Sequence, residues 1–174
     1  MAVRGSTEPR VRDRLDTVIA DLDETIKELR TAIFGLQGSG PAPGGVRGRL
    51  FAVISDAGPA LGFDARLQFE GALESIDAGL VDDLVAVLRE ALANVARHAH
   101  ARQVRVGVAV GDQVELFVSD DGDGVPDEVV GGRGLTNMET RAARRGGQFE
   151  VVRRPEGGTR LRWSAPAGPG RSTM

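Results

Sequence analysis

The sequence has 174 residues and a net charge of −3, and its 41% apolar and 27% charged residues are ordinary for a globular domain with an appendage. It contains no cysteine and two histidines, which excludes disulfides, thiolate chemistry, cysteine-bound metals and a three-histidine zinc site. The charge lacks the basicity of a general nucleic-acid binder, and no apolar run approaches the ~18 residues of a membrane span. We therefore expect a soluble, cytoplasmic protein.

A heptad-like apolar seam runs through the first segment, from about Val11 to Gln37. Leucine and isoleucine alternate along it at spacings of four and three residues: Leu15, Ile19, Leu22, Ile26, Leu29, Ile33 and Leu36. A long helix with so narrow a stripe needs a partner, and a second copy of the helix is the simplest one. We expect a dimer rather than a helix lying on its own domain, because the glycine- and proline-rich residues 38–45 are typical of a linker.

The remaining sequence predicts helices and strands in alternation. A short helix over 46–57 and a strand over 63–69 precede a long core helix from about 80 to 99, whose apolar residues recur at helical spacing. Strands over 104–110 and 114–118, a helix over 135–142, and a hairpin of strands over 148–153 and 159–163 follow. This order predicts an α+β two-layer sandwich, a mixed sheet covered by helices, preceded by one long dimerisation-type helix.

The same patterns give the expected domain boundaries. We predict a partial dimerisation helix over residues 1–37, a linker over 38–49, a globular domain over 50–165 and a disordered tail over 166–174.

Four polar residues share one face of the predicted helix over 80–99. Glu90, Asn94 and His98 recur at intervals of four residues, with Arg97 beside them. A carboxylate and an amide oxygen at this spacing suit magnesium, which prefers a few protein oxygens together with phosphates and water. Arg97 would then meet a phosphate. A solvated polar face is the alternative if this pattern is taken alone.

Two glycine clusters follow. The segment 120–124, Asp-Asp-Gly-Asp-Gly, closes a strand, and its glycines allow a backbone to approach a ligand closely while a carboxylate binds an amine. Alone, it also fits a calcium turn or a plain hairpin. The segment 131–134, Gly-Gly-Arg-Gly, precedes the helix that begins at Leu135, where free N–H groups favour phosphate. A helix-initiating loop without a ligand is the alternative.

Taken in order, these motifs resemble the ATP-binding domain of the GHKL superfamily, which includes sensor histidine kinases, type II topoisomerases, mismatch-repair ATPases and certain chaperones. The matching motifs are Glu90-x-x-x-Asn94, Asp120-x-Gly122-x-Gly124, Gly132-x-Gly134-Leu135 and Gly157-Gly158-Thr159. Residues 89–99 are similar to the histidine kinases that pair with nitrate-response-type regulators. Residues 23–37 resemble the second helix of that subfamily's dimerisation hairpin, most closely in actinobacterial haem-sensing dormancy-type kinases.

The resemblance implies ATP and Mg²⁺ as ligands and a role for each matching residue. Asp120 would accept a hydrogen bond from the adenine amino group, with Thr159 near the ring. Asn94 and Glu90 would hold magnesium, and Glu90 would also act in acid–base catalysis or position water. The other implied contacts are a phosphate contact from Arg97, a lid or stacking group from His98, the adenine pocket from Gly122 and Gly124, and a phosphate-side lid hinge from Gly132, Gly134 and Leu135.

The resemblance also implies transfer of the γ-phosphate to a histidine and then to a response regulator, in a protein that is a homodimer when intact. In this family the acceptor histidine lies on the first helix of the dimerisation hairpin, whereas the first histidine of this sequence is His98. We therefore expect the sequence to supply the ATP site without the acceptor, as a fragment or a truncated homologue. A serine kinase of the anti-sigma type and a docking module with a decayed nucleotide site are the alternatives.

The C-terminal part is rich in arginine, at positions 141, 144, 145, 153, 154, 160 and 162. Because tyrosine is absent and tryptophan occurs once, stacking on bases is not supported. We expect a solvated basic surface and no nucleic-acid partner, with attraction of phosphate or of an acidic regulator as the functional variant.

Overall fold

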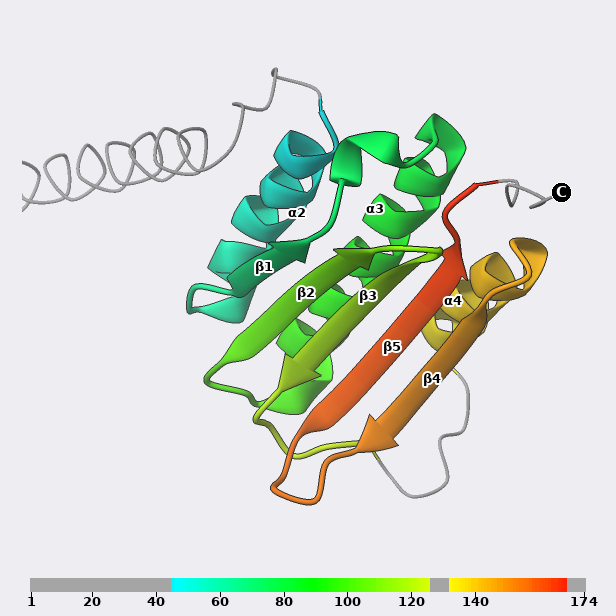
Figure 1. The fold of residues 1–174 in the computed structure, drawn as a ribbon. Helices are drawn as coiled ribbons and strands as arrows, with labels where there is room; N and C mark the ends of the chain where they lie inside the picture. Colours follow the sequence, from blue (N-terminus) through cyan, green and yellow to red (C-terminus); the bar gives the residue numbers. More distant parts are fainter. Residues whose placement is uncertain (1–44, 126–131, 169–174) are drawn as a thin grey trace, which may run out of the picture. The chain divides into compact units, whose positions relative to one another are not determined.

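The computed structural model describes residues 45–125 and 132–168, which form a sheet with helices packed on one face (Figure 1). Contacts along the chain divide it into two units, Met1–Ala42 and Pro43–Met174, and the described residues belong to the second. The predicted dimerisation helix over 1–37 and residues 38–44 of the linker expected over 38–49 lie outside the described residues. So do residues 126–131, between the two glycine clusters, and 169–174 of the expected tail.

A five-stranded mixed sheet forms one layer, with the strand order β1-β2-β3-β5-β4. Strand β1 (Arg66–Glu70) runs parallel to β2 (Val104–Val110), and all other neighbours are antiparallel. These are β3 (Gln113–Asp120), β5 (Thr159–Pro166) and β4 (Gln148–Arg153). In Figure 1 the sheet lies in front and the helices cover its rear face. The predicted sandwich of a mixed sheet covered by helices is confirmed.

The helical layer carries one part of the predicted site, namely the motifs at the end of α3 and the start of α4. It consists of α2 (Val46–Leu61), α3 (Ala78–Asn94), the π-helical turn η2 (Val95–Ala99) that continues α3, and α4 (Arg133–Arg144), with the short 3₁₀ turn η1 (Leu73–Ser75) before α3. Asp77 caps α3 by accepting a hydrogen bond from the Leu80 N–H at 2.9 Å. The stripe predicted on α3 is buried, at Leu80, Val81, Leu84, Val85, Leu88, Ala91 and Leu92.

Alternation along the strands fills the core from the sheet side. Val104, Val106 and Val108 of β2 are buried, because residues two apart point to the same face of a strand. Trp163 of β5 is fully buried, and its indole N–H donates to the Met138 carbonyl of α4 at 3.2 Å. The core therefore attaches α4, which carries the second glycine cluster at its start, directly to the sheet.

Two expected boundaries differ from the structure. Helix α2 begins at Val46 and runs on to Leu61, so residues 46–49 belong to this helix rather than to a linker. Strand β5 continues past Trp163 to Pro166, where Ala165 is buried opposite Val114. Composition suggested a tail from 166, but pairing with the full length of β3 extends the strand beyond the point where the glycine- and proline-rich composition begins.

One ion-pair cluster fixes α4 against α3. The Asp83 carboxylate accepts hydrogen bonds from Arg141 at 2.6 Å and from Arg145 at 2.8 Å, and its side chain is 17% exposed. Burial pushes the pKa of Asp83 upward, but the hydrogen bonds and charges of Arg145 and Arg141 outweigh it, so the pKa lies below the ordinary value of 3.8. The charged carboxylate therefore stabilises the folded domain.

We expect Asp83→Asn to lower the free energy of unfolding at pH 7 by about 1–2 kcal/mol, between the values for exposed and buried pairs. Because the folded pKa lies below the unfolded one, this contribution is present above the unfolded pKa and is lost as the pH falls through the folded pKa. Urea denaturation of both proteins at several pH values measures the difference. A gap that stays constant from pH 7 to below pH 3.8 would contradict this account.

Candidate functional site

The end of α3 brings together three of the predicted residues. The Arg97 guanidinium donates from Nη2 to Glu90 Oε1 and to Asn94 Oδ1, each at 3.3 Å, and from Nε to the Ala93 carbonyl at 3.1 Å. Glu90 and Asn94 are half-buried and Arg97 is exposed. The positively charged Arg97 guanidinium thus lies beside the carboxylate and the amide oxygen. Its bonds to them are long, so another acceptor can replace them easily.

The start of α4 lies against the same carboxylate. A Cβ added to Gly134 would overlap Glu90 Oε1, so the absence of a side chain at this position leaves room for the carboxylate. Gly132 precedes the helix as its N-cap residue and is exposed, while Leu135 is half-buried against the core. The structure therefore joins the second glycine motif to the Glu90–Asn94 motif.

A π-helical turn reshapes the end of α3. Such turns inside helices often occur at functional sites. Here η2 ends at Ala99, whose carbonyl accepts a hydrogen bond from the Asp123 N–H at 2.8 Å. A Cβ on Gly122 would overlap that carbonyl, so this close approach requires glycine. The first glycine loop is thereby attached to the helix that carries Glu90 and Asn94.

The two histidines occupy different environments. His98 lies in η2 and is exposed. His100 has a positive φ of 48° and forms a 2.8 Å contact between Nδ1 and Asp123 Oδ2, with both side chains exposed. Of the two, His100 contacts the loop 120–124.

Asp120 is the last residue of β3 and is 4% exposed. The hydrogen bonds to its carboxylate go to one of the two oxygens. Its Oδ1 accepts hydrogen bonds from the Gly122 N–H at 2.9 Å and from the Thr159 N–H at 3.1 Å. Within the described part of the chain, no buried side-chain oxygen or nitrogen lacks a partner. Neither of these bonds goes to Oδ2, so Oδ2 is the carboxylate oxygen that these two bonds leave for a further donor.

The neighbouring Asp121 is exposed, and its carboxylate bonds to the backbone of the chain before β2. Its Oδ1 accepts hydrogen bonds from the backbone N–H groups of Arg102 and Gln103, both at 2.8 Å. These bonds hold the pKa of Asp121 below its ordinary value. The two adjacent aspartates thus differ in their partners: Asp120 bonds to the N–H groups of Gly122 and Thr159, and Asp121 to those of Arg102 and Gln103.

The turn between β4 and β5 closes the site from the other side. Gly158 has a φ of 83°, and a Cβ there would overlap the Asp120 carbonyl. Two arginines at the start of this turn also bind the loop: Arg153 donates to the Asp123 carbonyl at 2.9 Å and Arg154 to the Asp120 carbonyl at 2.6 Å. The arginine-rich composition predicts both residues on a basic surface, because a bond between residues so distant in the chain leaves no periodic signal in the sequence.

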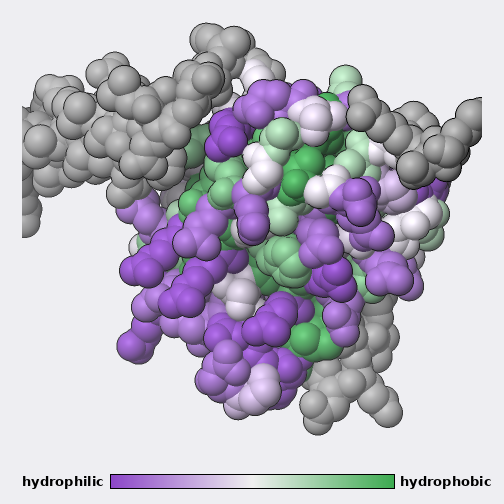
Figure 2. Space-filling view, in the orientation of Figure 1, coloured by the Kyte–Doolittle hydropathy of each residue, from purple (hydrophilic) through white to green (hydrophobic). Residues whose placement is uncertain are grey.

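Four of the seven arginines expected on a basic surface form ion pairs. Arg141 and Arg145 pair with Asp83, Arg154 pairs with Glu156, and Arg162 pairs with Glu115. Hydrophilic residues cover much of the sheet face that the helices leave open (Figure 2). On this face the Arg162 guanidinium also lies 5.9 Å from the centre of the Phe117 ring. On this face Arg162 is therefore held by both a carboxylate and an aromatic ring.

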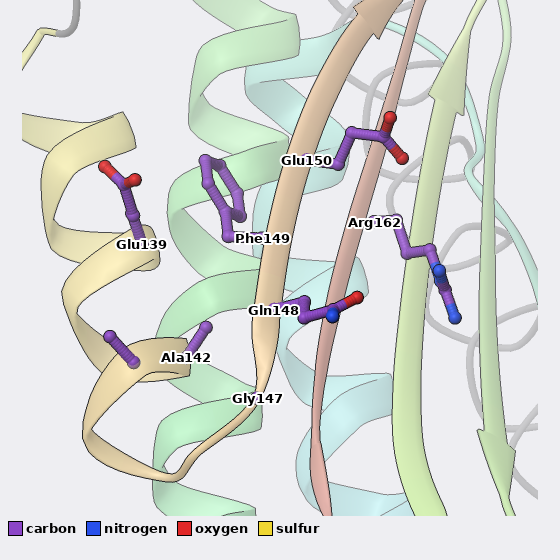
Figure 3. Close-up of a pocket in the computed structure, with 8 residues that line it drawn as sticks. Glu139, Ala142, Gly147, Gln148, Phe149, Glu150 and Arg162 are labelled. Carbon is purple, nitrogen blue, oxygen red and sulfur yellow. The ribbon is translucent and has the colours of Figure 1, made fainter.

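Apart from the candidate site, the domain has a groove of about 490 Å³ between α4 and the edge strand β4 (Figure 3). It is lined by Glu139, Ala142, Ala143, Gly147, Gln148, Phe149, Glu150 and Arg162. It contains none of the residues predicted from the motifs, so it is separate from the candidate site.

The donor set fits a magnesium ion shared with phosphates better than a closed protein cage. Among the described residues no group of three or more histidine, cysteine, aspartate or glutamate side chains could hold a metal. Glu90 and Asn94 supply two hard oxygens on one helix, and the adjoining Gly134 leaves the Glu90 carboxylate uncovered by a side chain. Magnesium commonly takes one or two protein oxygens and completes its shell with phosphates and water.

The layered fold, with its glycine loops at one end of the sheet, is that of the catalytic domain of histidine kinases. Residues 79–169 match the family of histidine kinase-, DNA gyrase B- and HSP90-like ATPases, and the chain belongs to this family. Its domain is accordingly a GHKL-type ATPase domain of the kind found in two-component sensor histidine kinases.

Two relatives that the chain resembles in sequence are sensor proteins. The chain is 32% identical over 155 residues to the nitrate/nitrite sensor protein NarX of Escherichia coli K12, covering 86% of this chain and 25% of that protein. It is 33% identical over 94 residues to the sensor protein VraS of Staphylococcus aureus strain COL, covering 52% of this chain and 27% of that protein. The chain thus spans about a quarter of the length of these relatives.

Solved structures agree on the fold. The blue-light activated histidine kinase of Erythrobacter litoralis superimposes with a TM-score of 0.55 at 19% identity, over 68% of this chain and 40% of that one. The ATP-binding domain of PrrB from Mycobacterium tuberculosis does so with a TM-score of 0.51 at 23% identity, over 70% and 93%.

Proposed function

We propose that this domain binds ATP with Mg²⁺ and supplies the γ-phosphate for phosphorylation of a histidine, from which a response regulator receives it. The main support is that four motifs distant in the chain share contacts at one end of the sheet. Gly134 lies against Glu90, Gly122 against the end of α3, and the Thr159 N–H bonds to Asp120.

Asp120 provides the adenine anchor in this proposal. Two backbone N–H groups hold its Oδ1, so Oδ2 keeps a fixed direction and accepts a hydrogen bond from the adenine amino group. Gly122 and Gly124 shape the pocket, and the Thr159 side chain lies near the ring. Because the carboxylate is fixed before the ligand arrives, little ordering entropy opposes binding.

The phosphate side is formed by the end of α3 and the start of α4. Asn94 and Glu90 hold the magnesium ion, which neutralises phosphate charge when bound. Arg97 then exchanges its 3.3 Å bonds for a phosphate oxygen, and Glu90 positions water or accepts a proton. Gly132, Gly134 and Leu135 form the hinge of the lid, and His98 is its stacking group.

The phosphorylated histidine belongs to another segment in this proposal. His98 lies on the nucleotide-binding turn, and His100 contacts Asp123 of the adenine loop. We propose a homodimeric, cytoplasmic sensor kinase of the nitrate-response type, and the narrower actinobacterial group remains a prediction. None of the helices in residues 45–125 and 132–168 has the length and apolar character needed to cross a membrane.

Thermal unfolding with ATP and magnesium tests the nucleotide site directly. A ligand that binds the folded state alone stabilises it by about 1.4 kcal/mol at a free concentration ten times its dissociation constant. We expect the melting temperature to rise with ATP and Mg²⁺, and to rise less when EDTA replaces the metal. An unchanged melting temperature up to millimolar ATP would indicate a decayed site and would overturn the proposal.

The chemistry of the acceptor is tested separately. With labelled ATP and candidate partner proteins, phosphohistidine is lost on acid treatment, whereas the phosphoserine made by an anti-sigma-type kinase is retained. Acid-labile label supports the histidine kinase assignment, and acid-stable label contradicts it.

A further inference from the structure

Arg154 is an arginine enclosed by the β4–β5 turn, with a side chain that is 19% exposed. Its guanidinium has three directed bonds. Nη1 donates to the Asp120 carbonyl at 2.6 Å, while Nη2 and Nε donate to Glu156 Oε1 at 2.6 and 3.2 Å. Glu156 therefore orients the guanidinium, and the guanidinium in turn holds the main chain of Asp120.

The backbone position makes this contact possible. Asp120 is the last residue of β3, and the register between β3 and β5 ends one residue earlier, at Ser119 opposite Arg160. The side chain of Arg154 thus binds a carbonyl just beyond the β3–β5 ladder. Gly158 brings the turn close enough, because any Cβ there would overlap that same carbonyl.

The bond acts on the residue whose side chain forms the adenine anchor. A carbonyl fixed by a guanidinium limits rotation of the Asp120 backbone, and therefore the direction of its carboxylate. The arginine fork suits this task because it reaches the carbonyl and the Glu156 carboxylate in separate directions, which a lysine ammonium does less well. The hydrogen bond from Arg154 also lowers the pKa of Glu156.

We propose that Arg154, oriented by Glu156, is a positioning residue that holds the Asp120 backbone and so acts together with the two N–H bonds to Oδ1 in directing the carboxylate toward the adenine amino group. This inference rests on the proposed nucleotide site and adds to it a residue outside the motifs. Arg154 does not touch the nucleotide and acts through Asp120.

A double-mutant cycle tests the proposal by titration calorimetry. We expect Arg154→Ala to weaken ATP binding by about 2- to 10-fold, the value of one hydrogen bond, and Arg154→Lys to recover part of the loss. In the Asp120→Ala background the same change should have no further effect, because there is no carboxylate left to orient. Arg144→Ala, which removes an exposed arginine of α4, is the charge control and should bind ATP like the parent.

A nucleotide analogue separates positioning from general loss of structure. Purine riboside triphosphate lacks the 6-amino group, so its affinity should be the same for Arg154→Ala and the parent. Equal losses for ATP and this analogue, or additive losses in the cycle, would overturn the proposal. If Asp120→Ala itself bound ATP like the parent, the proposed nucleotide site would fail instead. Should Arg154→Ala not fold, Glu156→Gln provides the same comparisons with a smaller expected loss.

Discussion

Replacing Asp120 with alanine is expected to weaken ATP binding by about 1.5–3 kcal/mol, or roughly 10- to 150-fold, the range for a hydrogen bond that involves a charged group. The reason is geometric as well as electrostatic. Oδ1 is held by two backbone N–H groups, which leaves Oδ2 as the acceptor for the amino group. Isothermal titration calorimetry with ATP and magnesium measures the loss.

Asp112→Ala is the matched control for this experiment. Asp112 is an exposed aspartate in the turn between β2 and β3, and the bond it receives from the Ala167 N–H goes to its backbone carbonyl. This variant should bind ATP like the parent. Because the Asp120 carboxylate also accepts bonds within the loop, melting temperatures must accompany the titrations. An Asp120→Ala protein that is folded and binds ATP with unchanged affinity would refute the adenine anchor.

Replacing Asn94 with alanine is expected to abolish the gain in ATP affinity that magnesium provides. The amide oxygen lies beside Glu90 Oε1, since both accept a bond from the same Arg97 nitrogen at 3.3 Å. Without the amide, a single carboxylate remains to hold a metal that normally takes one or two protein oxygens with the phosphates. Affinities with magnesium and with EDTA should then agree within about twofold, which is roughly 0.4 kcal/mol.

Two variants make the result specific to the metal. Asn94→Asp keeps an oxygen at the same position and should retain the magnesium dependence. Gln68→Ala removes an exposed amide from β1, at the far edge of the sheet order from β4, and should behave like the parent. A magnesium dependence as strong in Asn94→Ala as in the parent would show that the metal has other ligands.

Much of the fold follows from local patterns. The strands predicted over 104–110 and 148–153 have those bounds in the structure, because alternation of apolar residues is a property of the strand itself. The helix predicted over 80–99 occupies that region, but its last five residues form a π-helical turn. A single inserted turn leaves no mark on the apolar stripe, so the sequence could not reveal it.

By itself, the sequence determined the layered α+β class, the position of the core helix and the motifs that carry the candidate site, since each depends on residues close together in the chain. The tertiary structure decided which contacts those motifs make with one another and with the rest of the domain. It directs two backbone N–H groups to one oxygen of Asp120, it binds Asp121 to the backbone of Arg102 and Gln103, and it brings Arg154 to the Asp120 carbonyl. Such contacts join residues tens of positions apart, and they exist only when the sheet and helices have packed.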